Sequence, residues 1–280
     1  MSADALAAGL AGTVFGPVRF VGETGSTNAD LKAEARAGAP EGLVLVADHQ
    51  TAGRGRHGRA WVAPPGTALL ASALLRPPLE GDVLALLSPA TALAVRDACA
   101  AAGVNAQLKW PNDVIAALPD GPDEAKLAGV LAELHTGHGD STAVVVGFGV
   151  NLTAESALRE AVAAASAPAR ESGFAPLPPV ALDTLAARPV SRHELLISAL
   201  RCLDAAYRRL LAPGGPAELL AELRRHSATL GRRVRILTPG GAITGTAEDL
   251  GADGALVVAT ADGRVAVAAG DCRHLRAEPA

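Results

Sequence analysis

The sequence predicts an α+β protein in which a mixed domain precedes a small all-β module. Three observations lead to this prediction. Up to about residue 229, short apolar runs of strand length alternate with stretches of helical periodicity. After Gly231 the helical periodicity stops, and five short alternating runs follow, separated by glycine-containing turns. The 280 residues are enough for one large domain and a small one.

The elements of the first domain follow from the spacing of apolar residues. Strands are predicted at Val18–Val21, Leu43–Asp48, Ala68–Leu75, Ala106–Lys109, Val114–Ala116, Lys126–His135 and Ala143–Val150. Helices are predicted at Ala29–Ala37, Leu84–Ala102, Ser191–Leu211 and Pro216–His226. Two helix starts have the spacing of a capping box, Thr27 with Asp30 and Ser191 with Glu194. The last two strands are almost continuously apolar, which is typical of strands covered on both faces.

The same reading divides the chain into segments. Residues 1–17 are an N-terminal extension, residues 18–229 the main domain and residues 230–280 the β module. Within the main domain, Thr153–Arg188 is rich in alanine and proline and is expected to be a surface insertion of low order. The strands predicted in the module are Arg233–Leu237, Ala242–Glu248, Ala255–Ala259, Arg264–Ala268 and Arg273–Leu275. This spacing indicates a small barrel.

Composition limits the class and the compartment. The formal net charge is −4 and aromatic residues make up only 2% of the chain, which argues against a broad nucleic-acid surface. Cys99, Cys202 and Cys272 are far apart and odd in number, so they match neither a disulfide framework nor a metal cluster. No apolar stretch looks long and uninterrupted enough to span a membrane, and the start of the chain lacks the features of a signal peptide. We therefore expect a cytoplasmic protein without a membrane partner.

The most informative segment is the loop Gly53–Arg59, which reads Gly-Arg-Gly-Arg-His-Gly-Arg and is followed by Trp61. Its three arginines repel one another unless an anion lies between them. Its three glycines leave the backbone disordered unless a ligand holds it. The loop is therefore predicted to grip a phosphate and to become ordered on binding.

Three other interpretations of this loop exist. A dinucleotide-binding fingerprint needs a helix to begin in the glycine turn, but Pro64, Pro65 and Gly66 prevent one. A nucleic-acid contact predicts more positive charge and interleaved aromatic residues. A solvated surface loop is the third, and the loop alone does not exclude it.

Two further clusters combine polar groups with turns. Ser26, Thr27 and Asn28 precede a predicted helix and form either an N-cap or the binding site of a polar ligand head. The run Lys109–Asp113, Lys-Trp-Pro-Asn-Asp, reads as a turn after a strand. A structural turn does not explain a lysine at the end of an apolar strand. The functional interpretation places Lys109 on a phosphate, with Asn112 or Asp113 near a bound Mg²⁺.

Glycines interrupt two neighbouring predicted strands. Gly129 follows Lys126 in one strand, and Gly147 and Gly149 share a face of the next. An interior glycine weakens a strand, so it often marks the close approach of another group to the backbone. Packing can explain any one of them, whereas a flat ligand lying on the sheet explains the set.

Five motifs together resemble one known family. They are Ser26–Asn28, Gln50–Trp61, Lys109–Asp113, Lys126–Leu131 and Gly147–Leu152. In order and spacing they match the motifs of biotin–protein ligases, and the helices and terminal module extend the resemblance to nearly the whole chain. The resemblance implies a mixed sheet related to class II aminoacyl-tRNA synthetases, followed by a barrel of the Src-homology-3 type. Some members carry an N-terminal winged helix-turn-helix that represses biotin genes. Only about 20 residues precede the first strand here, so we expect a monofunctional ligase without a DNA partner.

The resemblance also implies a two-step reaction. Biotin and MgATP give biotinyl-5′-AMP and pyrophosphate, and a lysine of a biotin carboxyl carrier domain of an acyl-CoA carboxylase then takes the biotinyl group. A closed loop would shield the reactive anhydride from water. Biotin and ATP with Mg²⁺ are substrates, and no tightly bound cofactor is expected. The oligomeric state is left open, with a homodimer among the expectations.

Site residues are carried over motif by motif. Residues expected to act in catalysis are Arg56, Lys109 and Lys126. Residues expected to bind biotin are Ser26, Thr27, Asn28, Gln50, Gly53, Arg54, Gly55, Arg56, Lys126, Gly129, Gly147 and Gly149. Residues expected to bind ATP are Arg56, Arg59, Trp61, Lys109, Asn112, Lys126 and Asn151, with Asp113 as the candidate ligand of Mg²⁺. His57 stands where the family often has arginine, and its side chain is expected to face solvent.

Two rival functions share parts of this pattern. Lipoate–protein ligases share the catalytic fold, but that family lacks the glycine-arginine loop. A non-catalytic biotin-binding protein would be indicated by loss of Lys126 or of the loop arginines, and all of these are present.

Overall fold

The computed structural model describes residues 3–118, 124–136, 142–153, 156–165 and 177–275. A seven-stranded mixed sheet forms the centre of the first domain, in the order β1-β2-β3-β7-β6-β5-β4. Its strands are β1 (Val18–Thr24), β2 (Val44–Gln50), β3 (Ala68–Leu75), β4 (Ala106–Lys109), β5 (Asp113–Ala117), β6 (Glu124–Thr136) and β7 (Thr142–Asn151). β1 and β2 are parallel, and the other neighbours are antiparallel. The sequence predicted all seven.

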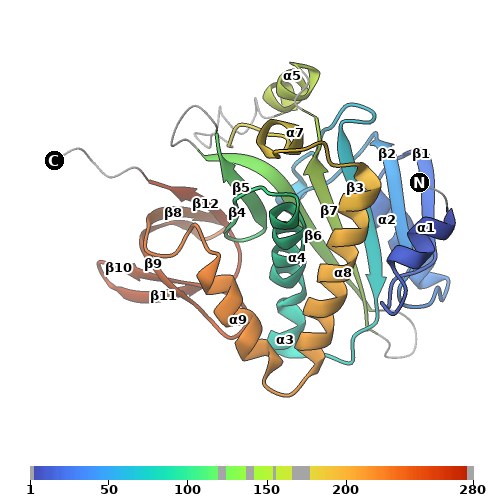
Figure 1. The fold of residues 1–280 in the computed structure, drawn as a ribbon. Helices are drawn as coiled ribbons and strands as arrows, with labels where there is room; N and C mark the ends of the chain where they lie inside the picture. The colour runs from blue at the N-terminus through green and yellow to red at the C-terminus, as the bar shows by residue number, and fades with distance from the viewer. Residues whose placement is uncertain (1–2, 119–123, 137–141, 154–155, 166–176, 276–280) are drawn as a thin grey trace.

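Helices cover the two faces of this sheet unequally. On one face, α4 (Leu87–Ala101) and α8 (Arg192–Leu211) lie side by side (Figure 1). They bury the main apolar core, which includes Val46 and Leu75. On the other face, α2 (Thr27–Arg36) packs Leu31 against strand residues such as Leu74. Alternate residues of each strand therefore point to opposite faces of the sheet. α2 covers only part of the sheet face on which it packs.

The most apolar helical stretch is Gly81–Ala101, which comprises α3 (Gly81–Ala85) and α4. By length and a mean hydropathy of 1.4 it could cross a membrane, contrary to the expectation that no stretch qualifies. Of its most apolar window of 18 residues, 56% is buried, and α4 packs against both α8 and the sheet. A helix that is apolar almost all round is also what a buried core position requires.

The second domain is a five-stranded antiparallel sheet in the order β11-β10-β9-β8-β12. The strands are β8 (Arg233–Thr238), β9 (Gly241–Leu250), β10 (Leu256–Thr260), β11 (Gly263–Val267) and β12 (Asp271–His274). Val234, Ile236 and Val258 are fully buried, whereas their neighbours along the strands are more exposed. This alternation is what one buried face requires. The α+β class with a second, antiparallel sheet is thus confirmed.

The connection between the domains touches the edge of the large sheet. After α9 (Gly215–Arg225) the chain runs beside β4. The amide of Leu108 donates to the carbonyl of His226 at 2.9 Å, and the amide of Ala228 donates to the carbonyl of Leu108 at 2.8 Å. These bonds fix the second domain next to the Lys109–Asp113 turn.

Two segments contain helices that the sequence did not predict. The N-terminal extension contains helix α1 (Ala3–Gly9), and Asp204 of α8 accepts a hydrogen bond from the amide of Val14 at 2.8 Å. In the predicted low-order insertion, α5 (Ser156–Ala165) and α7 (Leu182–Leu185) are helical. Leu182 is buried in the core, and the amide of Val180 donates to the carbonyl of Lys126 at 3.0 Å. Composition alone does not reveal such docking, and the remainder of the insertion lies outside the described residues.

Candidate active site

A cavity of about 1340 Å³ lies on the free part of the sheet face, between α2, the glycine-arginine loop and the second domain. With one exception, every residue that the sequence assigned to biotin, ATP or Mg²⁺ lines it. The exception is Gly53, whose missing side chain leaves room for the carbonyl oxygen of Trp61, 2.5 Å from an added Cβ. Gly53 therefore shapes the loop from outside the cavity.

The start of α2 forms the polar end of the cavity. Gln50 Oε1 accepts hydrogen bonds from the amide and the hydroxyl of Thr27, at 2.8 and 3.0 Å. The Ser72 hydroxyl donates to Asn28 Oδ1 at 2.6 Å and lies 2.7 Å from the Thr27 hydroxyl. Ser26, Thr27, Asn28 and Ser72 are all buried. A group of neutral donors and acceptors held in one place suits a neutral polar ligand head.

This arrangement corrects the capping prediction at α2. Ser26, not Thr27, is the N-cap residue, and no side-chain cap bond is formed. Asp30 instead accepts from the Thr24 hydroxyl at 2.5 Å, so its carboxylate is used outside the helix. At α8 the predicted box is confirmed, because Ser191 and Glu194 exchange both hydrogen bonds. At α2 the side chains that would cap the helix are turned to the cavity.

The glycines of β6 and β7 form the floor of the cavity. Gly129 and Gly149 are paired across the two strands. In this structure the indole of Trp61 covers them, because added Cβ atoms would lie 3.0 and 2.5 Å from its ring. At Gly147 an added Cβ would lie 2.0 Å from Asn28 Oδ1, so this glycine makes room for a side chain of the site. The buried Trp61 Nε1 has no hydrogen-bond partner in the described part of the chain.

A cluster of opposite charges occupies the middle of the cavity. Lys126 Nζ lies 2.7 Å from Asp113 Oδ1 and 5.4 Å from the centre of the Trp61 ring. Burial alone would raise the pKa of Asp113, but Lys126, Lys109 and Arg59 together hold that pKa below its ordinary value. Asp113 is therefore an anion at neutral pH. Among the described residues, no group of three or more His, Cys, Asp or Glu side chains could hold a metal ion.

The glycine-arginine loop closes over this cluster and reaches the second domain. Arg59 pairs with Asp271 of β12. Burial lowers the pKa of Arg56, and the nearby Asp271 and Asp113 oppose that shift. His57 adopts a left-handed φ of 54° and its side chain is exposed, as expected. Asp271 and Asp113 thus place negative charge next to Arg56 and Arg59 of the loop.

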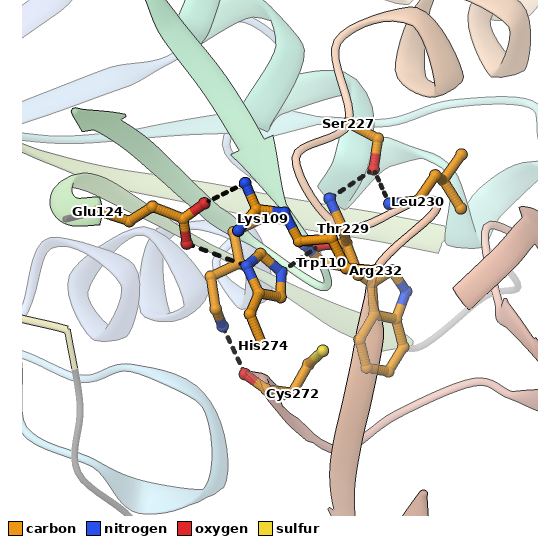
Figure 2. A network of polar contacts seen from close by, with 9 residues as sticks. All are labelled: Lys109, Trp110, Glu124, Ser227, Thr229, Leu230, Arg232, Cys272 and His274. Carbon is orange, nitrogen blue, oxygen red and sulfur yellow. Dashed lines mark hydrogen bonds and ion pairs between the residues drawn. The ribbon is translucent and has the colours of Figure 1, made fainter. Parts of the chain in front are cut away.

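The Lys109–Asp113 turn is held by a polar network that joins the interdomain connection to the second domain (Figure 2). The amide of Trp110 donates to Thr229 Oγ1 at 3.0 Å, and His274 Nε2 lies 3.0 Å from the same oxygen. His274 Nδ1 lies 2.9 Å from Glu124 Oε2. Because Thr229 Oγ1 accepts a hydrogen bond from the Trp110 amide, its own hydroxyl proton can be donated to His274 Nε2. We therefore assign the proton of the imidazole ring to Nδ1, which faces Glu124.

Lys109 belongs to the same network. Its side chain is buried, and Nζ donates to the carbonyl of Cys272 at 2.5 Å. Burial would raise the pKa of Glu124, but His274, Arg232 and Lys109 lower it below the ordinary value. The ammonium of Lys109 thus borders the cavity while its position is set by β12.

Two amide side chains brace the strands around the site. Asn151 Nδ2 donates to the carbonyls of Lys126 and Val180, at 3.2 and 3.1 Å. Asn112 Nδ2 donates to the carbonyl of Val130 at 2.6 Å. Both side chains line the cavity, so they also fix its walls.

Sequence reasoning missed several polar residues that line the cavity, among them Ser72, Glu124, Asp271 and His274. Of these four, all but Ser72 come from, or bond to, the second domain. Ser72 had a usable signal, since it interrupts an otherwise apolar strand whose residues are all buried. His274 and Asp271 had none, because nothing in the chain tells which face of a distant module meets the loop.

Comparison with known proteins agrees with this geometry. Residues 23–151 match the biotin/lipoate A/B protein ligase family, and residues 229–275 match the biotin protein ligase C-terminal domain. The biotin–acetyl-CoA-carboxylase ligase of Mycobacterium tuberculosis is 37% identical over 95% of this chain and 92% of its own length. The corresponding ligase of Paracoccus denitrificans is 34% identical over 90% of this chain and 98% of its own length. The Aquifex aeolicus biotin protein ligase in complex with biotin and ATP superimposes with a TM-score of 0.71 and 25% identity, covering 94% of this chain and all of that one (100%). With both domains matched in sequence and fold, the chain belongs to the biotin protein ligase family and is a ligase.

Proposed function

We propose that this enzyme activates biotin with ATP to biotinyl-5′-AMP and transfers the biotinyl group to a lysine of a biotin carboxyl carrier domain. The observation that carries the proposal is the cavity itself. It joins a buried end of neutral donors and acceptors, at Thr27, Gln50 and Ser72, to the charged cluster of Lys126 and Arg56. A ureido ring fits the first environment and an acyl phosphate fits the second.

In the first step the biotin carboxylate attacks the α-phosphorus of ATP, and the bond to pyrophosphate breaks. Negative charge builds on the phosphate oxygens, so cations already held in place stabilise the transition state. Lys126 serves the junction of carboxylate and phosphate, Arg56 and Arg59 the phosphates, and the backbone of Arg54–Arg56 the carboxylate. Loss of one such donor costs about 3–4 kcal/mol of barrier.

Mg²⁺ enters with ATP in this proposal. A carboxylate together with phosphate oxygens is a donor set that Mg²⁺ prefers. The anionic Asp113 fits that role, and its contact with Lys126 would then be exchanged for the cation. When bound, the ion neutralises charge on the phosphates.

In the second step the ε-amine of the acceptor lysine attacks the acyl carbon and AMP leaves with the bonding electrons. The M. tuberculosis and P. denitrificans relatives are named for acetyl-CoA carboxylase. We extend that acceptor to this chain, together with a cytoplasmic location, where ATP and such carriers are found. Homodimer formation is part of the same proposal and is measured by sedimentation.

The test is to incubate the purified protein with MgATP and either biotin or lipoate, and to look for retained acyl-AMP by mass spectrometry. We expect biotinyl-AMP, lost in Lys126→Ala. Lipoyl-AMP alone would move the protein to the lipoate ligases. Tight biotin binding without any adduct would mean a binding protein, and the proposed mechanism would be wrong.

A further inference from the structure

The second domain carries three arginines on one exposed face. Arg233 and Arg235 alternate on β8 with the buried Val234 and Ile236. Arg273 lies on β12, directly opposite Arg235 in the antiparallel register. All three side chains are exposed. We call Arg233, Arg235 and Arg273 the arginine strip.

The strip differs from other arginines of this domain. Arg232 pairs with Glu124 at 2.8 Å, and Arg264 pairs with Glu248 at 2.7 Å. Within the described ranges, the side chains of the strip form no ion pair or hydrogen bond. Like charges placed directly opposite each other on neighbouring strands destabilise a sheet. The pair Arg235–Arg273 is therefore left for an anion from outside the chain.

The position of the strip relates it to the cavity. Arg233 and Arg273 line the cavity and are exposed, so they stand at its rim. Arg235 does not line it, and two residues along a strand advance by about 7 Å. The strip thus leads from the rim onto the outer surface. A nucleotide in the cavity would account for Arg233 and Arg273, but it leaves Arg235 without a role.

We propose that the arginine strip is the docking surface for an acidic face of the protein domain that supplies the acceptor lysine. This inference rests on the proposed function, which requires a lysine of a second protein to reach the rim. The chain has a formal net charge of −4. An acidic partner is therefore repelled by much of the surface and attracted at the strip, which orients it on the rim.

A protein partner fits better than a nucleic acid. A nucleic-acid site needs positive charge along several phosphates. The rest of the second domain does not extend the strip with positive charge, since it also carries Glu248, Asp249, Asp253 and Asp262, which would repel a longer polyanion. The small footprint matches a few carboxylates beside one lysine.

The experiment separates docking from chemistry. Biotinyl-AMP is formed on the enzyme, and its transfer is measured to a purified apo biotin carboxyl carrier domain and to Nα-acetyl-lysine amide, which is too small to dock. We expect Arg235→Glu to raise KM for the carrier domain about tenfold and to leave transfer to the small amine unchanged. The matched control is Arg264→Glu, an exposed arginine away from the cavity, and it should leave both rates unchanged. Added salt should reduce the difference between wild type and Arg235→Glu.

Other outcomes overturn the inference. An unchanged KM for the carrier in both Arg235→Glu and Arg235→Gln, with folding verified by thermal unfolding, would show that the strip does not dock it. Equal slowing with both acceptors would place Arg235 in the chemistry instead. A duplex of about 20 base pairs that binds wild type but not Arg235→Glu at physiological salt would assign the strip to nucleic acid. Absence of biotinyl-AMP in the wild type, by contrast, would contradict the proposed function itself.

Discussion

The indole of Trp61 rests on the backbone of Gly149, where an added Cβ would stand 2.5 Å from Cε2 of the ring. The glycine that the sequence assigned to biotin therefore accommodates one of the enzyme's own side chains in this structure. Lys126 faces the same ring and Asp113 faces Lys126. A series of contacts thus joins the glycine floor of the cavity to Trp61, which follows the glycine-arginine loop, and to the Lys126–Asp113 pair.

Gly149→Ala is expected to destabilise the protein, because the new methyl group displaces the indole. Overpacking of this kind costs about 1–3 kcal/mol. The matched control is Gly22→Ala, also in a strand, where an added Cβ meets nothing within 4 Å. Urea unfolding measures both variants. A Gly149→Ala protein as stable as Gly22→Ala would show that Trp61 does not rest on this floor in solution.

Ligand binding is expected to move Trp61, since ring and ligand cannot both occupy the floor. Intrinsic fluorescence should therefore change when biotin and MgATP are added to the wild type. The chain has two tryptophans, and the other, Trp110, is buried and bonded to the second domain through Nε1 at 3.1 Å. Trp61→Phe should abolish the signal, whereas a change retained in that variant would assign it to Trp110.

Asp113 and Lys126 make a pH-dependent contribution to stability. The pKa of Asp113 is lower in the folded state, so its contribution is present above the unfolded pKa of about 3.9 and is lost as the pH falls through the folded value. Asp113→Asn removes the partner of Lys126 and should cost about 1–3 kcal/mol at pH 7. We expect its stability to fall less than that of the wild type between pH 7 and pH 3. The free energy of unfolding of both proteins is measured with urea at pH 7 and at pH 3. An equal decrease in the two proteins would contradict this expectation.

Thr229→Val tests the network behind the Lys109–Asp113 turn. The substitution keeps the shape of a fully buried residue but leaves the Trp110 amide and His274 Nε2 without their partner. We expect a loss of about 1–3 kcal/mol of stability and a higher KM for ATP, because the Lys109 turn is then less well fixed. The control is Thr238→Val, whose hydroxyl bonds at the surface of the second domain and should cost little. Equal effects of the two variants would mean that the network does not position the turn.

Local periodicity was enough to predict all strands and the main helices, because their apolar spacing is set by burial. The glycine-arginine loop and the glycine-containing strands could likewise be placed at the site from their chemistry. Which group lies on these glycines could not be predicted, since a missing Cβ does not tell whether a ligand or Trp61 fills the space. His274 and Asp271 were out of reach for a related reason. They enter the site only through the packing of two domains, and α1 and Leu182 owe their order to tertiary contacts in the same way.

The hydrogen bonds between Leu108 and residues 226–228 have a consequence for handling the protein. They place the interdomain connection along the last strand of the large sheet. A bare strand edge is a template on which other chains can add strands and aggregate. Cutting the protein between its domains would therefore do more than remove one wall of the cavity. It would leave residues 226–228 at a free chain end, no longer anchored on that edge by the second domain, so the isolated first domain is expected to precipitate more readily than the intact chain.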